Sequence, residues 1–255
     1  GHLDPEGPLQ IEVPIAIGAG LVFFGSEAFK SHIAPLRCRV CASNALDDGV
    51  RSALAWKDPT YARLASDVSL FLVAPALAVT SQIVASGAER RSAEAGANVF
   101  FVVEAVLISS LVNQATKFLV ARERPFVHAL REEEKAKLPH ASDSNLSFYS
   151  GHTSATFTLA VAGGTVAELR GYRAAPVIWA TGGALALVTG YLRIAADKHH
   201  FTDVLTGAVM GSALGFAVPF LFHGRTGRAP ALASPVEVPG QTAPAFVPIT
   251  YAGVF

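Results

Sequence analysis

The stretch VLTGAVMGSALGFAVPFLF, residues Val204–Phe222, carries no charged side chain over 19 residues. A helix needs roughly 20 mainly apolar residues to cross the hydrocarbon core of a bilayer. Gly207, Gly211 and Gly215 recur at four-residue spacing, and small residues on one helical stripe let neighbouring helices approach closely in lipid. The stretch therefore predicts a tightly packed transmembrane helix.

Five more apolar segments precede this one, at about Leu9–Phe29, Val68–Gly87, about Ala95–Thr116, about Thr153–Ala167, and Ala174–Leu192. Charged residues make up 16% of the 255-residue chain, against roughly 25% in a typical soluble domain. A soluble all-α protein with buried helices is the alternative, but its helices would show a polar face at 3.6-residue spacing. We therefore expect an all-α, six-transmembrane helical bundle.

The domain organisation follows from the same pattern. Residues 1–222 are expected to form a single membrane domain with a core at about 100–222, and residues 223–255, which are rich in proline, to form a flexible tail. The formal net charge is +0, which gives no electrostatic case for binding nucleic acid. Oligomeric state is left open by these features.

Six spans place the first, third and fifth loops on one side of the membrane, and three polar clusters lie at the ends of the third and fifth loops. In the first cluster, Lys117 and Arg124 are seven residues apart. On a helix this is about two turns, so both side chains are expected to point the same way. Such a pair suits a phosphate dianion, although two basic residues can equally anchor a helix at the lipid headgroups.

The second cluster, Ser150-Gly151-His152, lies where the third loop enters the fourth helix. Ser150 is a candidate N-cap, and Gly151 leaves the backbone open to a ligand. A helix N-terminus attracts anions, and His152 could protonate a leaving oxygen there. An ordinary capped helix with an interfacial histidine is the alternative.

The third cluster contains Arg193, His199 and Asp203. His199 and Asp203 are four residues apart, hence on one face of a regular turn. A carboxylate on one imidazole nitrogen fixes the tautomer and leaves the other nitrogen free to attack. His-x-x-x-Asp could instead supply two metal ligands, but the other clusters offer cations, which repel a metal and attract a phosphate.

Together the clusters resemble the three-part signature of the type 2 phosphatidic acid phosphatase superfamily, Lys-x6-Arg-Pro, Pro-Ser-Gly-His and Ser-Arg-x5-His-x3-Asp. The matching residues are Lys117, Arg124, Pro125, Ser150, Gly151, His152, Arg193, His199 and Asp203. Tyr149 and Leu192 replace the first residue of the second and third parts, which removes no charge and no proposed catalytic group. The match covers the helical core, about Phe100–Phe222.

The resemblance implies a two-step phosphatase mechanism without metal or cofactor. His199, oriented by Asp203, would attack phosphorus and form a phosphohistidine, and His152 would protonate the leaving group and then activate water. The phosphoryl oxygens would be held by Lys117, Arg124, Ser150, Gly151 and Arg193. A membrane-embedded site implies a lipid substrate, such as phosphatidic acid, phosphatidylglycerol phosphate, a polyprenyl pyrophosphate or a lipid A phosphate.

Three rival functions use the same residues differently. A soluble acid phosphatase or vanadium haloperoxidase of the same superfamily is disfavoured by the uncharged spans. A transferase that passes the phosphoryl group to another lipid or sugar would carry the same motifs. A membrane channel or transporter could use Glu104 and the histidines as an ion path, but it leaves the triple motif unexplained.

Two arguments about the orientation of the protein in the membrane disagree. The side with loops one, three and five holds 14 of the 20 Lys and Arg, which by the positive-inside rule places it in the cytoplasm. The family resemblance implies the opposite, a bacterial inner-membrane protein whose active site faces the periplasm, and we follow the resemblance. Cys38 and Cys41 would then face an oxidising compartment and could pair; two reduced thiols, or a zinc site with His32, are the alternatives.

Overall fold

The computed structural model describes residues 9–135, 137–138 and 143–223, and its described part is helical, with a single isolated β-bridge between Val40 and Arg122. Of the predicted Pro-rich tail, residues 223–255, the first residue is helical and residues 224–255 lie outside the described ranges. The helical elements are α1 (Leu9–Ala28), α2 (Lys30–Ile33), α3 (Ala45–Leu54), α4 (Thr60–Val68), η1 (Ser69–Val73), α5 (Ala74–Ala88), η2 (Ser92–Glu94), α6 (Ala95–Val120), α7 (Pro125–His128), α8 (Glu132–Lys135), α9 (Gly151–Leu169), α10 (Ala175–Ala195), α11 (Phe201–Val218) and η4 (Pro219–His223). The predicted all-α class is confirmed.

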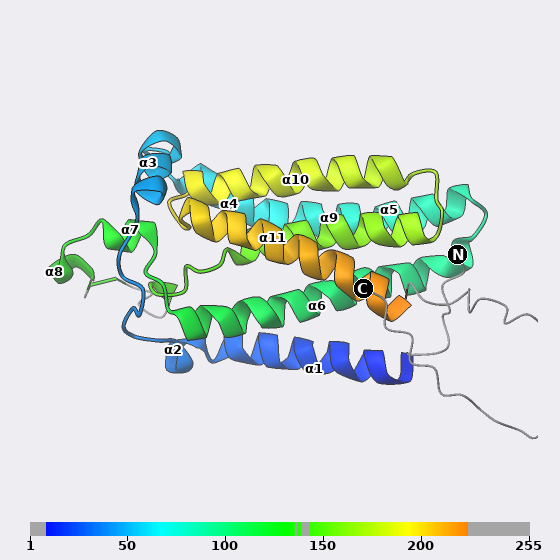
Figure 1. The fold of residues 1–255 in the computed structure, drawn as a ribbon, viewed down its shortest axis with the longest axis horizontal. Coiled ribbons are helices and arrows are strands. Elements are labelled where there is room, and N and C mark those ends of the chain that lie inside the picture. The colour runs from blue at the N-terminus through cyan, green and yellow to red at the C-terminus, as the bar shows by residue number, and fades with distance from the viewer. Residues whose placement is uncertain (1–8, 136, 139–142, 224–255) are drawn as a thin grey trace, which may run out of the picture.

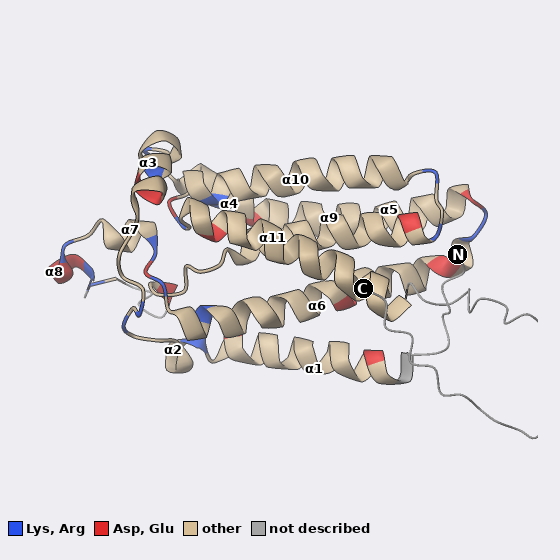
Figure 2. Ribbon diagram, viewed as in Figure 1, with Lys and Arg blue, Asp and Glu red and all other residues tan. Residues whose placement is uncertain are grey.

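Five helical segments in the described ranges are long and apolar enough to cross a membrane: Ile11–Ala28, Thr60–Ala88, Ser92–Val120, Ala175–Ala195 and Phe201–His223. Large apolar side chains cover their outer faces, among them Leu21, Phe71, Val84, Leu187 and Val209, each more than half exposed. Figure 2 shows that charged residues gather at the ends of the bundle, while the helix lengths between them are largely uncharged. An apolar belt of this kind is what a bilayer requires of helices that face it.

The fourth predicted span, α9, does not belong to that set of five, so the expected six spans are not confirmed. It packs against α6, α10 and α11, and it runs between neighbouring helices in Figure 1. Many of its polar side chains, including Thr153, Ser154, Thr156 and Thr158, are buried and bonded within the protein. A helix surrounded by other helices does not need the apolar composition of one that faces lipid, which explains its lower hydropathy.

The predicted glycine stripe on the last helix packs against α9. A β-carbon at Gly207 would lie 2.8 Å from the Ser150 carbonyl oxygen, and one at Gly215 would lie 2.9 Å from the Thr158 carbonyl oxygen. At Gly211 a β-carbon would overlap the carbonyl of Ser154. The close approach inferred from the four-residue spacing is therefore confirmed.

Candidate active site

The three sequence clusters meet at one end of the bundle, where α6 and α10 end and α9 and α11 begin (Figure 1). α6 ends at Val120, because Ala121 adopts a left-handed conformation with φ 47°. The expectation that Lys117 and Arg124 share one helical face is therefore wrong, since the helix ends between them. Both side chains still reach the same site, since Arg124 lies 3.3 Å from Nε2 of His199 and Lys117 lies beside Gly151.

His199 lies in the short loop before α11 and is 2% exposed. Its Nδ1 lies 2.8 Å from the carbonyl oxygen of Ser147, and since a carbonyl can only accept, Nδ1 carries the hydrogen and donates it. Nε2 is left as the basic nitrogen, and it lies 3.3 Å from the Arg124 guanidinium. Burial, together with Arg124, Arg193 and Lys117, lowers the pKa of His199 well below 6.5, so the imidazole is neutral at neutral pH.

Asp203 lies beside His199 but is not its hydrogen-bond partner. Its Oδ2 is 3.7 Å from Nδ1 of His199, beyond hydrogen-bond range. The carboxylate instead accepts from the Ser147 hydroxyl at 2.6 Å and from the backbone N–H of His200 at 3.0 Å. The predicted contact of this carboxylate with the imidazole is thus replaced by an indirect one, because the Ser147 carbonyl occupies the position facing Nδ1.

Arg122 links Asp203 to the first loop, a role that its place in the sequence did not indicate. It is buried and donates to Asp203 at 2.6 Å, to Asp47 at 2.7 Å and to the Thr202 hydroxyl at 2.7 Å. Burial alone raises the pKa of the Asp47 carboxyl, but hydrogen bonds from Thr202 and Arg122 outweigh it and bring the pKa below 3.8. Arg122 therefore stands between two buried carboxylates.

His152 sits in the first turn of α9 and meets a carboxylate from α4. Its Nε2 lies 2.8 Å from Oδ1 of Asp67, and Arg193 donates to the same oxygen at 3.3 Å and to the Ser66 hydroxyl at 2.9 Å. Asp67 is a second residue that the sequence did not reveal. The predicted span began at the next residue, because a charge was taken to lie outside the membrane helix.

Lys117, Ser150 and Gly151 complete the site at the start of α9. Ser150 is the N-cap, and its hydroxyl oxygen accepts the backbone N–H of Thr153 at 3.4 Å. A β-carbon at Gly151 would lie 3.1 Å from Nζ of Lys117, so the ammonium lies directly over the open backbone. A cation and a helix N-terminus thus face one another, an arrangement that favours a bound anion.

One carboxylate, that of Asp143, already lies among the cations. It accepts from Arg124 at 3.0 Å and lies 3.7 Å from Nζ of Lys30. Burial raises the pKa of the Asp143 carboxyl, but Arg124, Lys30 and Lys117 outweigh this effect and hold the pKa at about 2. The cations thus have an acidic partner that a substrate phosphate would meet on entry.

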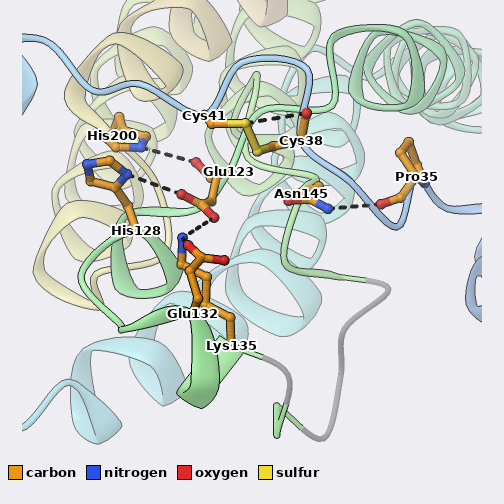
Figure 3. The surroundings of a disulfide bond; sticks show 9 residues. All are labelled: Pro35, Cys38, Cys41, Glu123, His128, Glu132, Lys135, Asn145 and His200. Atoms are coloured by element: carbon orange, nitrogen blue, oxygen red, sulfur yellow. Dashed lines mark hydrogen bonds and ion pairs between the residues drawn. A yellow bond between two sulfur atoms is a disulfide. The ribbon is translucent and has the colours of Figure 1, made fainter.

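The first loop is tied to this site next to a disulfide (Figure 3). Cys38 and Cys41 are bonded to each other, so this pair forms a disulfide and not two reduced thiols or a zinc site. Between the two cysteines, Arg39 donates its backbone N–H to the Ala121 carbonyl at 2.9 Å. The Val40 carbonyl accepts the backbone N–H of Glu123 at 3.0 Å. The loop therefore fixes the backbone on both sides of Arg122.

Comparison with known proteins agrees with this arrangement. A sequence profile of the PAP2 superfamily matches residues 98–226, about half of the chain and all three clusters. A crystal structure described as the first transmembrane PAP2 type phosphatidylglycerolphosphate phosphatase from Bacillus subtilis has the same fold, with a TM-score of 0.51 and 18% identity over 81% of this chain and 95% of that one. No curated protein matches the chain in sequence.

The fold and the three clusters thus define a helical membrane protein with a cationic, histidine-containing site. The chain belongs to the PAP2 superfamily, as the predicted resemblance implied.

Proposed function

We propose that the protein hydrolyses a lipid phosphate monoester or pyrophosphate through a phosphohistidine on His199. The observation that carries this proposal is the state of His199, a neutral imidazole with Nδ1–H bonded to Ser147 and the basic Nε2 facing Arg124. A nucleophile needs a lone pair, and in-line phosphoryl transfer needs cations around phosphorus. The lone pair of Nε2 accepts a hydrogen bond from Arg124 at 3.3 Å, and we propose that the phosphoryl group takes the place of this contact, with the guanidinium then bound to a phosphoryl oxygen.

The chemistry takes two steps. Nε2 of His199 attacks phosphorus, the bond from phosphorus to the leaving oxygen breaks, and His152 gives that oxygen its proton. Water then attacks the phosphohistidine and passes a proton to His152, which restores both histidines and releases inorganic phosphate. Lys117, Arg124, Arg193 and the backbone at Ser150–Gly151 bind the phosphoryl oxygens and stabilise the charge that develops on them.

The remaining carboxylates act as supports. Asp203, held by Arg122, fixes the Ser147 hydroxyl and the start of α11, and so positions His199 indirectly. Asp67 holds the imidazole of His152 and the guanidinium of Arg193 in one place. These roles explain why a site that binds an anion contains several acidic residues.

Phosphate release in detergent micelles tests the activity. Turnover should persist in EDTA, stop with orthovanadate, which mimics five-coordinate phosphorus, and disappear in His199→Ala. The matched control is His32→Ala, because His32 is an exposed histidine in α2 and its removal should leave turnover unchanged. A fully active His199→Ala enzyme would falsify the assignment.

A panel of phosphates tests the substrate class. A lipid phosphate reaches a site at the end of a membrane bundle by lateral diffusion, so we expect faster turnover of phosphatidic acid, phosphatidylglycerol phosphate, a polyprenyl pyrophosphate or a lipid A phosphate than of a water-soluble ester such as p-nitrophenyl phosphate. Equal kcat/KM for soluble and lipid esters would contradict a lipid specificity. Adding an alcohol acceptor separates hydrolysis from transfer, since a transferase would form a new phosphate ester.

We also propose that the site faces the periplasm of a bacterial inner membrane. The Cys38–Cys41 disulfide supports this placement, because disulfides persist in oxidising compartments. A membrane-impermeant maleimide should label these cysteines in intact cells only after reduction with an impermeant reductant. Labelling only after cell lysis would argue for a cytoplasmic face.

A further inference from the structure

Three ligand-type side chains meet inside the bundle, away from the phosphate site. Glu12 of α1, Glu104 of α6 and His223 of η4 are 4%, 0% and 2% exposed. Glu104 lies thirteen residues before Lys117 on α6, which is about 20 Å along a helix. The cluster joins three elements that are far apart in the sequence, and the phosphatase mechanism uses none of its members.

The geometry places the imidazole between the two carboxylates. Nε2 of His223 lies 3.1 Å from Oε2 of Glu104, and Nδ1 lies 3.6 Å from Oε2 of Glu12. One ligand atom from each residue lies within 4.8 Å of the other two. The Phe101 ring stacks on the imidazole with its centroid 3.5 Å away, which fixes the plane of the histidine.

Each of the three side chains also retains an unused polar atom. Oε2 of Glu12, Oε1 of Glu104 and Nδ1 of His223 are buried and have no hydrogen-bond partner among the described residues. Buried charged groups are costly unless they are paired or coordinate a metal. Because one ligand atom of each side chain lies within 4.8 Å of the other two, the cluster offers three donors to a single cation.

The donor set also indicates which cation. Two carboxylates balance the charge of a divalent ion, and one imidazole with two carboxylates suits zinc and its first-row neighbours better than magnesium or calcium, which prefer oxygen alone. Zinc bonds of about 2.0–2.2 Å place tetrahedral ligand atoms roughly 3.3–3.6 Å apart. The separation between Nε2 of His223 and Oε2 of Glu104, 3.1 Å, is close to this range, and the ligand atom of Glu12 lies within 4.8 Å of the other two.

We propose that Glu12, Glu104 and His223 bind one divalent transition-metal ion that fastens α1 and η4 to α6. Three protein ligands leave a fourth position for water. The ion is structural, and the proposal is independent of the phosphatase activity: the expectation that no metal takes part concerns the phosphate site at the other end of α6.

Metal binding to the full chain tests the proposal, using protein purified in detergent without a polyhistidine tag and stripped with EDTA. Titration with zinc chloride, read by calorimetry and by elemental analysis after gel filtration, should give one equivalent per chain. Glu104→Gln, which preserves the side-chain shape, and His223→Gln, at the last described turn, should each weaken binding by at least about 100-fold, since loss of a mere hydrogen-bond partner of a ligand already costs about 10–100-fold.

The control variant is His32→Gln, which removes the histidine nearest to Cys38 and Cys41 in the sequence and should keep the full equivalent. Zinc should raise the melting temperature of the wild type and of this control but not of Glu104→Gln, and EDTA should lower the melting temperature without lowering turnover at 25 °C. A wild-type chain that binds no zinc, or a folded Glu104→Gln chain that binds a full equivalent, overturns the proposal.

Discussion

Replacement of the buried Arg122 by methionine should destabilise the protein far more than the same replacement of an exposed arginine. Methionine keeps the apolar part of the side chain and removes the guanidinium, which leaves the carboxylates of Asp47 and Asp203 buried without their cation. Removing one partner of a buried ion pair costs about 3–5 kcal/mol, because the remaining charge stays desolvated. For a chain of this size that corresponds to a fall in melting temperature of about 6–20 °C.

The matched control is Arg51→Met. Arg51 also makes a two-bond ion pair, with both carboxylate oxygens of Asp197 at 2.7 Å, but its side chain is 36% exposed. Water can replace such a partner, and exposed pairs contribute only about 0–1 kcal/mol. The two variants are compared by thermal unfolding in the same detergent, measured as the loss of the monodisperse gel-filtration peak with temperature. Equal shifts for both would refute the argument that burial of Asp47 and Asp203 decides the outcome.

The double variant Asp47→Asn with Arg122→Met separates the pair from the single side chain. Because the neutral amide removes one of the two stranded charges, the combined loss should be smaller than the sum of the single losses by about 0.5–3 kcal/mol. Strict additivity would show that Asp47 and Arg122 act independently, contrary to their 2.7 Å contact.

Three other perturbations test the helix packing and the two histidines. Gly211→Ala should lower the melting temperature, because its β-carbon would overlap α9, whereas Gly183→Ala, with nothing within 4 Å, should be neutral or stabilising by up to about 1 kcal/mol; equal effects would contradict the close packing. Because the pKa of His199 is lowered by folding, below about pH 6.5 the unfolded chain binds a proton at this residue that the folded chain does not. The free energy of unfolding is therefore highest above about pH 6.5 and falls on acidification by up to about 1.4 kcal/mol per pH unit. Between pH 6.5 and 5 the melting temperature should therefore fall more steeply with decreasing pH for the wild type than for His199→Gln. Equal slopes would refute this role of His199. Asp67→Asn should lower kcat by about 10–100-fold and change the pH profile of kcat, since it alters the partner of His152; a change in KM alone would indicate a role in binding only.

The helices could be predicted from the sequence because a bilayer imposes length and apolarity on each span. The errors at their ends share a physical cause. The predicted spans began one residue after Asp67 and stopped one residue before Lys117 and before Arg193, yet all three lie within helices. Charge was taken as the edge of the membrane. Lys117 and Arg193 instead lie in the last turns of their helices and are directed to the site, and Asp67 pairs with His152 and Arg193.

The candidate site could be predicted only where its residues lie in one local pattern. Fixed spacing marked His199 and Arg193, but Asp47 is 75 residues from Arg122, and Asp67 is 85 residues from His152. Asp47 and Asp67 lie in segments whose composition resembles any polar loop or helix end. Their partners follow from tertiary packing, which the spacing of residues in one sequence does not encode.

The close approach of α11 to α9 connects the packing of the bundle to its chemistry. Gly207 brings α11 against the Ser150 carbonyl, and the backbone N–H of Ser150 donates to the Asp203 carbonyl at 3.1 Å. The first turn of α9, with its anion-binding N-terminus, is thereby fixed to the first turn of α11, which carries Asp203 and follows directly on His199. A side chain at Gly207 would therefore separate the proposed phosphate-binding turn from His199, the proposed nucleophile. The small residues that permit helix association in lipid thus also set the distance across which phosphoryl transfer is proposed to occur.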